Sequence, residues 1–210
     1  MAHDEFEEFE PVRGLPAKLP EGEEILWQGA PDWWALAKEG LSLYWVAGYF
    51  VVLFLWRAVV AAETMPVPTA VASASIFLLM GVAGCGLLML MAFLQARAAV
   101  YTVTNKRVVL RIGAALSMTL NLPYTWIGNA NLALRKSGTG TIAFELMGTH
   151  RFSYLMCWPH VRPWRMARTE PAFRCIPDAA MVAKIIAGAA ETRVAEPKIA
   201  RVKDDAVAAE

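Results

Sequence analysis

The sequence predicts an α+β membrane protein: a two-helix transmembrane hairpin, then a small β-barrel or roll capped by a C-terminal helix. First, the 210 residues are 57% hydrophobic and 19% charged, against roughly 45–50% and about 25% in soluble domains. Second, the excess of apolar residues lies in two long runs near the middle of the chain. Third, the runs are followed by short alternating segments, which are typical of strands. The composition excludes a disordered chain, and three cysteines exclude a disulfide scaffold.

The hairpin is predicted from the two apolar runs. Residues 41–62 hold a single charged residue, Arg57, and residues 69–94 hold none. At 1.5 Å per residue the shorter run reaches about 33 Å, enough for a hydrocarbon core of about 30 Å. A turn at residues 63–68 joins the two, so we expect a hairpin over residues 41–94.

The distribution of basic residues predicts the orientation of the hairpin. The turn has no Lys or Arg, whereas basic residues flank the other end of the hairpin: Lys38, Arg97, Lys106, Arg107 and Arg111. Cytoplasmic flanks of membrane helices carry an excess of Lys and Arg. We therefore expect both chain termini in the cytoplasm.

The front of the chain is acidic. Residues 1–40 carry three basic and ten acidic residues, and residues 95–210 carry sixteen and eight. We predict a flexible acidic segment over residues 1–30, in which Phe6 and Phe9 are candidate anchors for a partner's groove. The alternative is a solvated acidic tail. Residues 24–29 alternate briefly like a strand, and residues 31–40 predict a short interfacial helix, because Trp33 and Trp34 suit the membrane surface.

Residues 97–191 are predicted to form a cytoplasmic domain. Alternation and turn residues indicate strands at 100–104, 107–112, 116–122, 127–136, 141–146, 151–157 and 172–176. A helix is expected over Asp178–Glu191, because Pro177 can open it and Asp178 places negative charge at its N-terminus. Residues 192–210 are predicted to be a disordered tail.

No set of catalytic residues is visible. The only close pair of metal-binding residue types is Cys157 with His160, and no CxxC pair completes a structural site. His160 also lies between prolines, which is a poor position for a bacteriochlorophyll ligand. We therefore predict a protein that is not an enzyme and holds no cofactor or metal. Nucleic acid is an improbable partner, because the domain is tethered to a bilayer and its basic excess is modest.

Aromatic and basic residues alternate over residues 151–174, which gives a candidate partner surface. Its members are Trp158, His160, Arg162, Trp164 and Arg165. Trp and Arg are common anchors of protein interfaces, and the same residues suit an anionic membrane surface. A structural role in the loop and core is the third possibility. We favour the protein interface.

Small residues in the second apolar run mark a further candidate contact. Gly81 and Gly84 permit close approach of another helix. They either pack within the hairpin or form a groove for another membrane protein, and the sequence does not separate the two.

Two sets of motifs carry a family resemblance. Residues 24–31 (EILWQGAP) and 101–110 (YTVTNKRVVL) are similar to bacterial pleckstrin-homology-like (PH-like) membrane proteins. Residues 9–16 (FEPVRGLP), 158–164 (WPHVRPW) and 171–178 (PAFRCIPD) resemble the photosynthetic complex assembly proteins of purple bacteria, of the PuhB type.

The narrower resemblance covers about residues 6–190. It implies a PH-like domain and a non-enzymatic assembly factor of the bacterial inner (cytoplasmic or intracytoplasmic) membrane. Its partners would be reaction-centre and light-harvesting 1 membrane subunits and the lipid bilayer, and self-association into a homo-oligomer is left open. The broader resemblance leaves an alternative function, a lipid-sensing or general scaffolding membrane protein.

Overall fold

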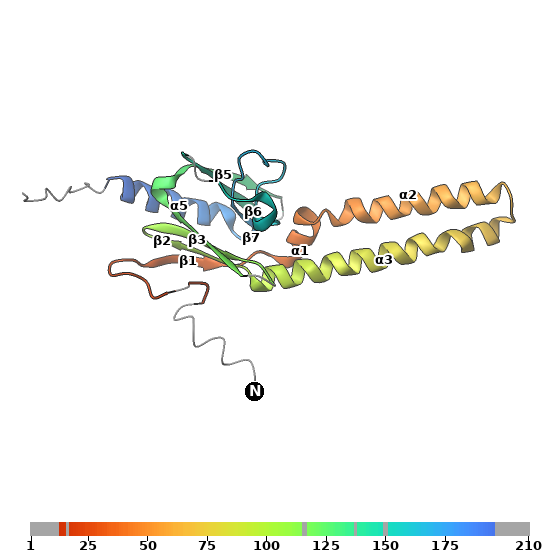
Figure 1. Ribbon diagram of the computed structural model, residues 1–210, viewed down its shortest axis with the longest axis horizontal. Coiled ribbons are helices and arrows are strands. Elements are labelled where there is room, and N and C mark those ends of the chain that lie inside the picture. Colours follow the sequence, from red (N-terminus) through yellow and green to blue (C-terminus); the bar gives the residue numbers. More distant parts are fainter. Residues whose placement is uncertain (1–12, 16, 115–116, 137, 149–150, 196–210) are drawn as a thin grey trace, which may run out of the picture.

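A computed structural model describes residues 13–15, 17–114, 117–136, 138–148 and 151–195. A long helical hairpin projects from one end of a two-sheet domain (Figure 1). In chain order the elements are β1 (Ile25–Gly29), α1 (Trp33–Ala35), the π-helix η1 (Leu36–Gly40), α2 (Leu43–Ala62), α3 (Val67–Ala98), β2 (Val100–Thr104), β3 (Arg107–Ile112), β4 (Met118–Pro123), the 3-10 turn η2 (Tyr124–Trp126), β5 (Ile127–Leu134), β6 (Gly140–Leu146), α4 (Tyr154–Cys157), β7 (Ala172–Ile176) and α5 (Ala179–Ala195).

The strands form two antiparallel sheets rather than a closed barrel. The first has the order β1-β2-β3-β4 and the second the order β5-β6-β7. Within the described residues no pairing joins the sheets. Pro123 ends β4, lacks an N–H to donate, and leads through η2 into the second sheet. The prediction of a barrel is therefore wrong, and the domain is an open arrangement of two sheets.

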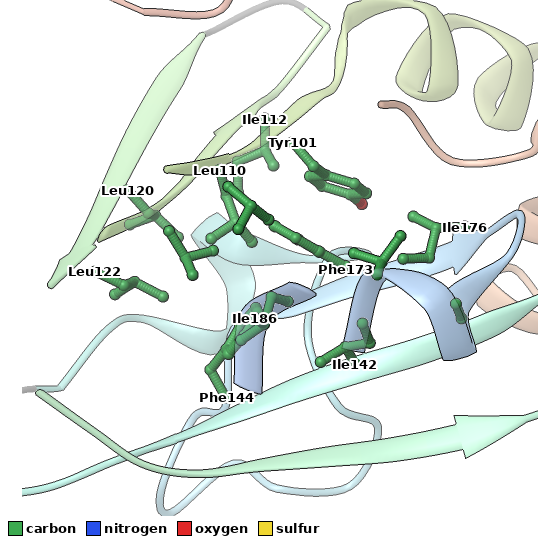
Figure 2. Packing of buried hydrophobic residues seen from close by; sticks show 14 of the residues in the cluster. Tyr101, Leu110, Ile112, Leu120, Leu122, Ile142, Phe144, Phe173, Ile176 and Ile186 are labelled. Carbon is green, nitrogen blue, oxygen red and sulfur yellow. The ribbon is translucent and has the colours of Figure 1, made fainter. Parts of the chain in front are cut away.

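The main hydrophobic core of the described residues lies between the two sheets and α5 (Figure 2), and two smaller clusters lie at the base of the hairpin. The Phe173 ring of β7 stacks on Tyr101 of β2 at a centroid distance of 4.5 Å and meets Phe144 of β6 edge-on at 5.1 Å. Val182 and Ile186 of α5 are also buried in this core. Burying side chains of this size contributes roughly 1.5–3 kcal/mol each, so α5 is an integral part of the fold.

Strand β1 belongs to the domain although it precedes the hairpin. It pairs with β2, with Trp27 opposite Val103 and Gly29 opposite Tyr101. The hairpin is thus inserted between two neighbouring strands of one sheet. The predicted flexible segment through residue 30, and the predicted start of the domain at residue 97, are wrong at this strand, because its backbone pairs with β2 and Trp27 packs against the core.

The acidic residues just before β1 pair with basic residues of the β2–β3 turn. The buried Glu23 carboxylate accepts hydrogen bonds from Arg107 Nε and Nη2 at 2.7 and 3.0 Å. It also accepts one from the Thr104 hydroxyl at 2.8 Å. The backbone oxygen of Glu21 accepts a hydrogen bond from Lys106 Nζ at 3.1 Å. Part of the acidic front therefore covers basic groups of its own domain. Phe6 and Phe9 lie outside the described residues.

Helices α2 and α3 confirm the predicted hairpin as a pair of helices. Both are long and apolar enough to cross a membrane, and they lie side by side along their length (Figure 1). Large apolar side chains on their outer faces are exposed, Trp45 and Val82 among them. Helix α3 runs past the predicted end at residue 94 to Ala98, because residues 95–98 are good helix formers. Only Ala99 separates it from β2.

The segment between β6 and β7 differs from the prediction. Residues 151–157 were expected as a strand, but Tyr154–Cys157 form the single helical turn α4. The rest is a loop whose stem is closed by a bridge between Val161 and Pro171. Pro159 and Pro163 provide no N–H groups for a strand ladder. The predicted C-terminal helix is present as α5, which continues past the predicted end at residue 191.

Candidate functional site

The candidate partner residues of the β6–β7 loop lie at the base of the hairpin. Figure 1 shows this loop on the end of the domain from which α2 and α3 project. A cleft of about 370 Å³ separates the loop from the start of α2. Its lining includes Gly40, Ser42, Trp158, Pro163, Trp164 and Arg174.

Trp158 and Trp164 are surface residues, and a contact site requires this exposure. The Trp164 side chain is 87% exposed on a backbone with a φ of +65°, and Trp158 is 41% exposed. Three exposed apolar neighbours were missed: Leu155, Met156 and Met166. Their signal in the sequence was a set of large apolar residues within a proline-rich segment that cannot form a regular strand.

Arg162 and Arg165 hold the stem of the loop. Arg162 Nη1 donates to the buried Glu170 carboxylate at 2.9 Å, and Arg165 Nε lies 3.5 Å from its other oxygen. The backbone N–H of Arg162 also donates to the carbonyl of Glu170. Both arginines remain partly exposed. They therefore fix the loop while leaving positive charge at its surface.

His160 is a core residue, so its prediction as part of the partner surface is wrong. It is fully buried, and its Nδ1 lies 2.6 Å from the Tyr101 hydroxyl. That hydroxyl oxygen also accepts the backbone N–H of Arg174 at 3.3 Å, and the buried Nε2 of His160 has no hydrogen-bond partner in the described part of the chain. Burial, together with the nearby Arg174 guanidinium, lowers the pKa of His160 to about 3. The imidazole is neutral at physiological pH.

Arg174 of β7 connects the loop to the helical segment before the hairpin, a role that the sequence did not indicate. Its buried guanidinium donates from Nη1 to the carbonyl of Val161 at 2.9 Å and from Nη2 to that of Glu39 at 3.2 Å. The Nε atom has no hydrogen-bond partner. The Glu39 carboxylate in turn forms an ion pair with Arg135 Nε of the β5–β6 turn at 3.1 Å. The β6–β7 loop, η1 and the β5–β6 turn are thus fixed to one another.

The thiols near this site are protonated at neutral pH. Cys157 and Cys175 are buried, and burial raises the pKa of each to about 11. Within the described residues, no three His, Cys, Asp or Glu side chains gather in a way that would hold a metal ion.

Gly81 and Gly84 pack within the hairpin. A Cβ at Gly81 would lie 2.8 Å from Phe50 Cβ of α2, and one at Gly84 would lie 3.7 Å from Phe50 Cε2. Beside them an apolar groove of about 330 Å³ remains open between the helices. Its lining consists of Ala47, Phe50, Val51, Leu78, Gly81, Val82 and Cys85.

The predicted residues therefore form two separate regions. Trp158, Trp164, Arg162 and Arg165 meet at the hairpin base, whereas Gly81 and Gly84 lie along the hairpin. We call these two regions the base surface and the hairpin groove.

Comparisons with known proteins found one family and two similar proteins. The bacterial PH domain family matches residues 42–190. A Rhodobacter capsulatus protein, described as an uncharacterized 23.7 kDa protein in the puhA 5′ region, is 46% identical over 204 residues, covering 95% of this chain and 94% of that protein. The crystal structure of a DUF1696 family protein with a pleckstrin-homology domain from Shewanella loihica PV-4 is 14% identical, with a TM-score of 0.30, over 44% of this chain and 71% of that one.

Proposed function

The chain belongs to the bacterial PH domain family, and we propose that it is a membrane-anchored assembly factor for photosynthetic complexes. In this role it binds reaction-centre and light-harvesting 1 membrane subunits and catalyses no reaction. One observation carries the proposal: the Rhodobacter capsulatus relative, similar over nearly the whole of both chains, is encoded beside the photosynthesis gene puhA. Proteins that act on one complex are often encoded together in bacteria.

The hairpin is the proposed membrane anchor. Helix α2 has 20 residues and α3 has 32, and about 20 residues suffice to cross a bilayer. Their outward apolar side chains are exposed in the protein alone, which suits a lipid environment better than water. The turn at the far end carries Glu63 and no basic residue, whereas Lys38 and Arg97 lie at the base. We therefore place the domain and both termini in the cytoplasm.

The hairpin groove is the proposed contact for a partner's membrane helix. It is lined only by apolar residues and Cys85, and glycine at position 81 keeps it open. Helices associate in lipid mainly through close packing, since no hydrophobic effect operates between them there. A groove with no polar lining suits an apolar helix of a membrane subunit.

Gene deletion tests the assembly role. In a photosynthetic host that lacks the gene, we expect fewer assembled reaction centre–light-harvesting 1 complexes, measured by membrane absorption spectra and native gels, while pigment synthesis continues. Complementation with the wild-type gene should restore the complexes. Normal complex levels in the deletion strain would overturn the proposal.

A groove-filling variant tests the site. Val82→Trp places a large ring at the groove, and Val59→Trp adds the same ring to an exposed position on α2 outside it. Complementation should fail for Val82→Trp and succeed for Val59→Trp at equal membrane protein levels. Equal complementation by both would show that the groove does not bind the partner.

A lipid-sensing or scaffolding role is the second candidate, and the exposed tryptophans and arginines of the base surface favour it. It predicts that complexes assemble normally without the gene. The deletion strain therefore separates the two functions.

A further inference from the structure

Five large apolar residues of the β6–β7 loop are exposed in the described part of the chain. We call Leu155, Met156, Trp158, Trp164 and Met166 the apolar tip. Leu155 is 84% and Trp164 is 87% exposed, and the other three are exposed as well. Single exposed apolar residues are common, but a cluster of this size within one loop marks an interaction site.

Three residues of the apolar tip lie at the level where the hairpin leaves the domain. Trp158, Trp164 and Met166 line the same cleft as Gly40 and Ser42. Helix α2 begins at the next residue, Leu43. If α2 enters the hydrocarbon region near its first turn, the apolar tip lies at the depth of the lipid head groups.

Aromatic residues occupy the same level beside the other helix. Trp33 of α1 lies edge-on to Phe93 of α3 at a ring distance of 6.2 Å, and Trp34 lies beside Trp33. The start of α2 and this part of α3 lie at the same level, because Leu41 and Leu43 pack with Ala92, one residue before Phe93. Tryptophan is enriched at membrane interfaces, where its ring is partly solvated. Four tryptophans are therefore placed as such a belt: Trp33 and Trp34 beside α3, and Trp158 and Trp164 beside α2.

The charges around the apolar tip suit an anionic lipid surface. Arg151 and Arg168 are exposed, and Arg162 and Arg165 are partly exposed. Glu170 lies beneath them, buried and paired with the last two. The other nearby carboxylate, Glu39, is paired with Arg135. Four arginines against one buried acid leave the loop positive, and basic groups near an anionic lipid surface strengthen binding to it.

We propose that the β6–β7 loop is a third membrane contact, which inserts its apolar tip into the head-group region of the bilayer that holds the hairpin. The inference rests on the membrane-spanning hairpin of the proposed function. Lipid is favoured over a protein because the tip shares its level with the start of α2, where head groups surround the molecule on every free side. The contact would hold the domain against the membrane and fix its orientation relative to the hairpin.

Spin labels at single cysteines test the insertion in full-length protein reconstituted into nanodiscs of phosphatidylglycerol and phosphatidylethanolamine. Cys85→Ala is the parent, since Cys157 and Cys175 are buried, with a raised pKa, and should label poorly. Labels are placed by Leu155→Cys and Met166→Cys, which keep both tryptophans. Ala187→Cys, exposed on α5, is the matched control, and Val52→Cys on α2 reports on the hairpin.

We measure collision of each label with oxygen, which enriches in lipid, and with a water-soluble nickel chelate. The oxygen-to-nickel ratio should be several-fold higher at positions 155 and 166 than at 187, and highest at 52. A high ratio at 52 with ratios at 155 and 166 equal to that at 187 would overturn the loop contact alone. Labels at 155 and 166 that neither reagent reaches would mean that protein covers the tip, which also overturns it. A low ratio at 52 would show that the hairpin does not span the membrane, and the loop proposal would fail with it. The assembly role itself is judged separately, by the deletion strain.

Discussion

At the scale of single residues, His160 ties the loop that carries the apolar tip to the core of the domain. Its Nδ1 shares a hydrogen bond with the Tyr101 hydroxyl, and Tyr101 stacks on Phe173 at the centre of the core. The imidazole is buried, and no described acidic group compensates a positive charge on it, since its charged neighbour is Arg174. Protonation of His160 therefore opposes folding.

This burial predicts a specific loss of stability in mild acid. The pKa of His160 falls from 6.5 to about 3 on folding. The stability that the neutral imidazole gives the folded state is therefore complete above pH 6.5 and is lost as the pH falls towards 3. Between pH 7 and pH 5 we expect a decrease of about 2 kcal/mol in the free energy of unfolding. Most carboxylates stay ionised in that window. Chemical denaturation of the detergent-solubilised protein, followed by near-UV circular dichroism, measures it.

His160→Gln is the matched variant, because it keeps a polar side chain that does not titrate. Its free energy of unfolding should be lower than that of the wild type at pH 7 and should change little down to pH 5. A wild-type stability that is equal at pH 7 and pH 5 would contradict the assignment of a buried neutral imidazole.

At the scale of elements, the strand before the hairpin shows which interactions could not be predicted. Residues 24–29 alternate too briefly to decide between strand and loop, and the partner strand β2 follows only after the entire hairpin. The residue pattern of a short segment carries no information on which distant strand it pairs with. By contrast, β2 and β3 were predicted with the observed bounds, because both alternate and Asn105-Lys106 forms a short turn between them.

Truncation tests the role of β1. Removing residues 1–30 uncovers the edge of β2 and takes the Trp27 side chain away from the core. We expect a loss of more than about 3 kcal/mol in the free energy of unfolding, or failure to fold. Removing residues 1–12 should leave the thermal midpoint of the detergent-solubilised protein unchanged. If both truncated proteins melt at the wild-type temperature, β1 is not part of the stable domain.

Two glycines of α3 form a matched pair for testing the hairpin. A Cβ at Gly81 meets Phe50, whereas one at Gly86 meets nothing within 4 Å. Gly81→Val should therefore destabilise the hairpin by roughly 1–3 kcal/mol, the usual cost of overpacking, and Gly86→Val should be tolerated. Thermal unfolding in mild detergent measures both. Equal midpoints for the two variants would contradict the observed packing of α2 on α3.

At the scale of the whole molecule, the hairpin and the domain are joined at both ends by direct connections. Helix α3 passes into β2 through Ala99 alone, and η1 is fixed to β7 by the hydrogen bond from Arg174 to Glu39. An insertion between two paired strands has no flexible linker on either side. We therefore expect the domain to follow any movement of the hairpin, which suits a protein that brings membrane subunits and their cytoplasmic faces together.

The orientation of the whole molecule is tested by labelling in spheroplasts. With Cys85→Ala as the parent, a membrane-impermeant maleimide should label Thr64→Cys in the far turn and should not label Ala187→Cys on α5. Lysis should make position 187 reactive. Labelling of 187 in intact spheroplasts would place the domain on the opposite side of the membrane.

Much of the architecture was predictable, but most of the candidate site was not. The hairpin follows from two long apolar runs, and the closing helix from Pro177 and the spacing of Val182 and Ile186. The aromatic and basic segment was recognised, yet His160 and Trp158 could not be told apart in it. The backbone path of an irregular loop decides which side chain turns inward, and residue pattern does not predict that path. Arg174 was unremarkable in the sequence, and only the approach of η1 to β7 gives it a connecting role.

The most direct test of the assembly role is to identify what the protein binds. The tagged full-length chain is purified in mild detergent from membranes of a photosynthetic host, and co-purifying proteins are quantified against an unrelated tagged protein with two membrane helices. We expect enrichment of reaction-centre or light-harvesting 1 subunits, and loss of that enrichment with Val82→Trp but not with Val59→Trp. A set of co-purifying proteins identical to that of the unrelated protein would contradict the account.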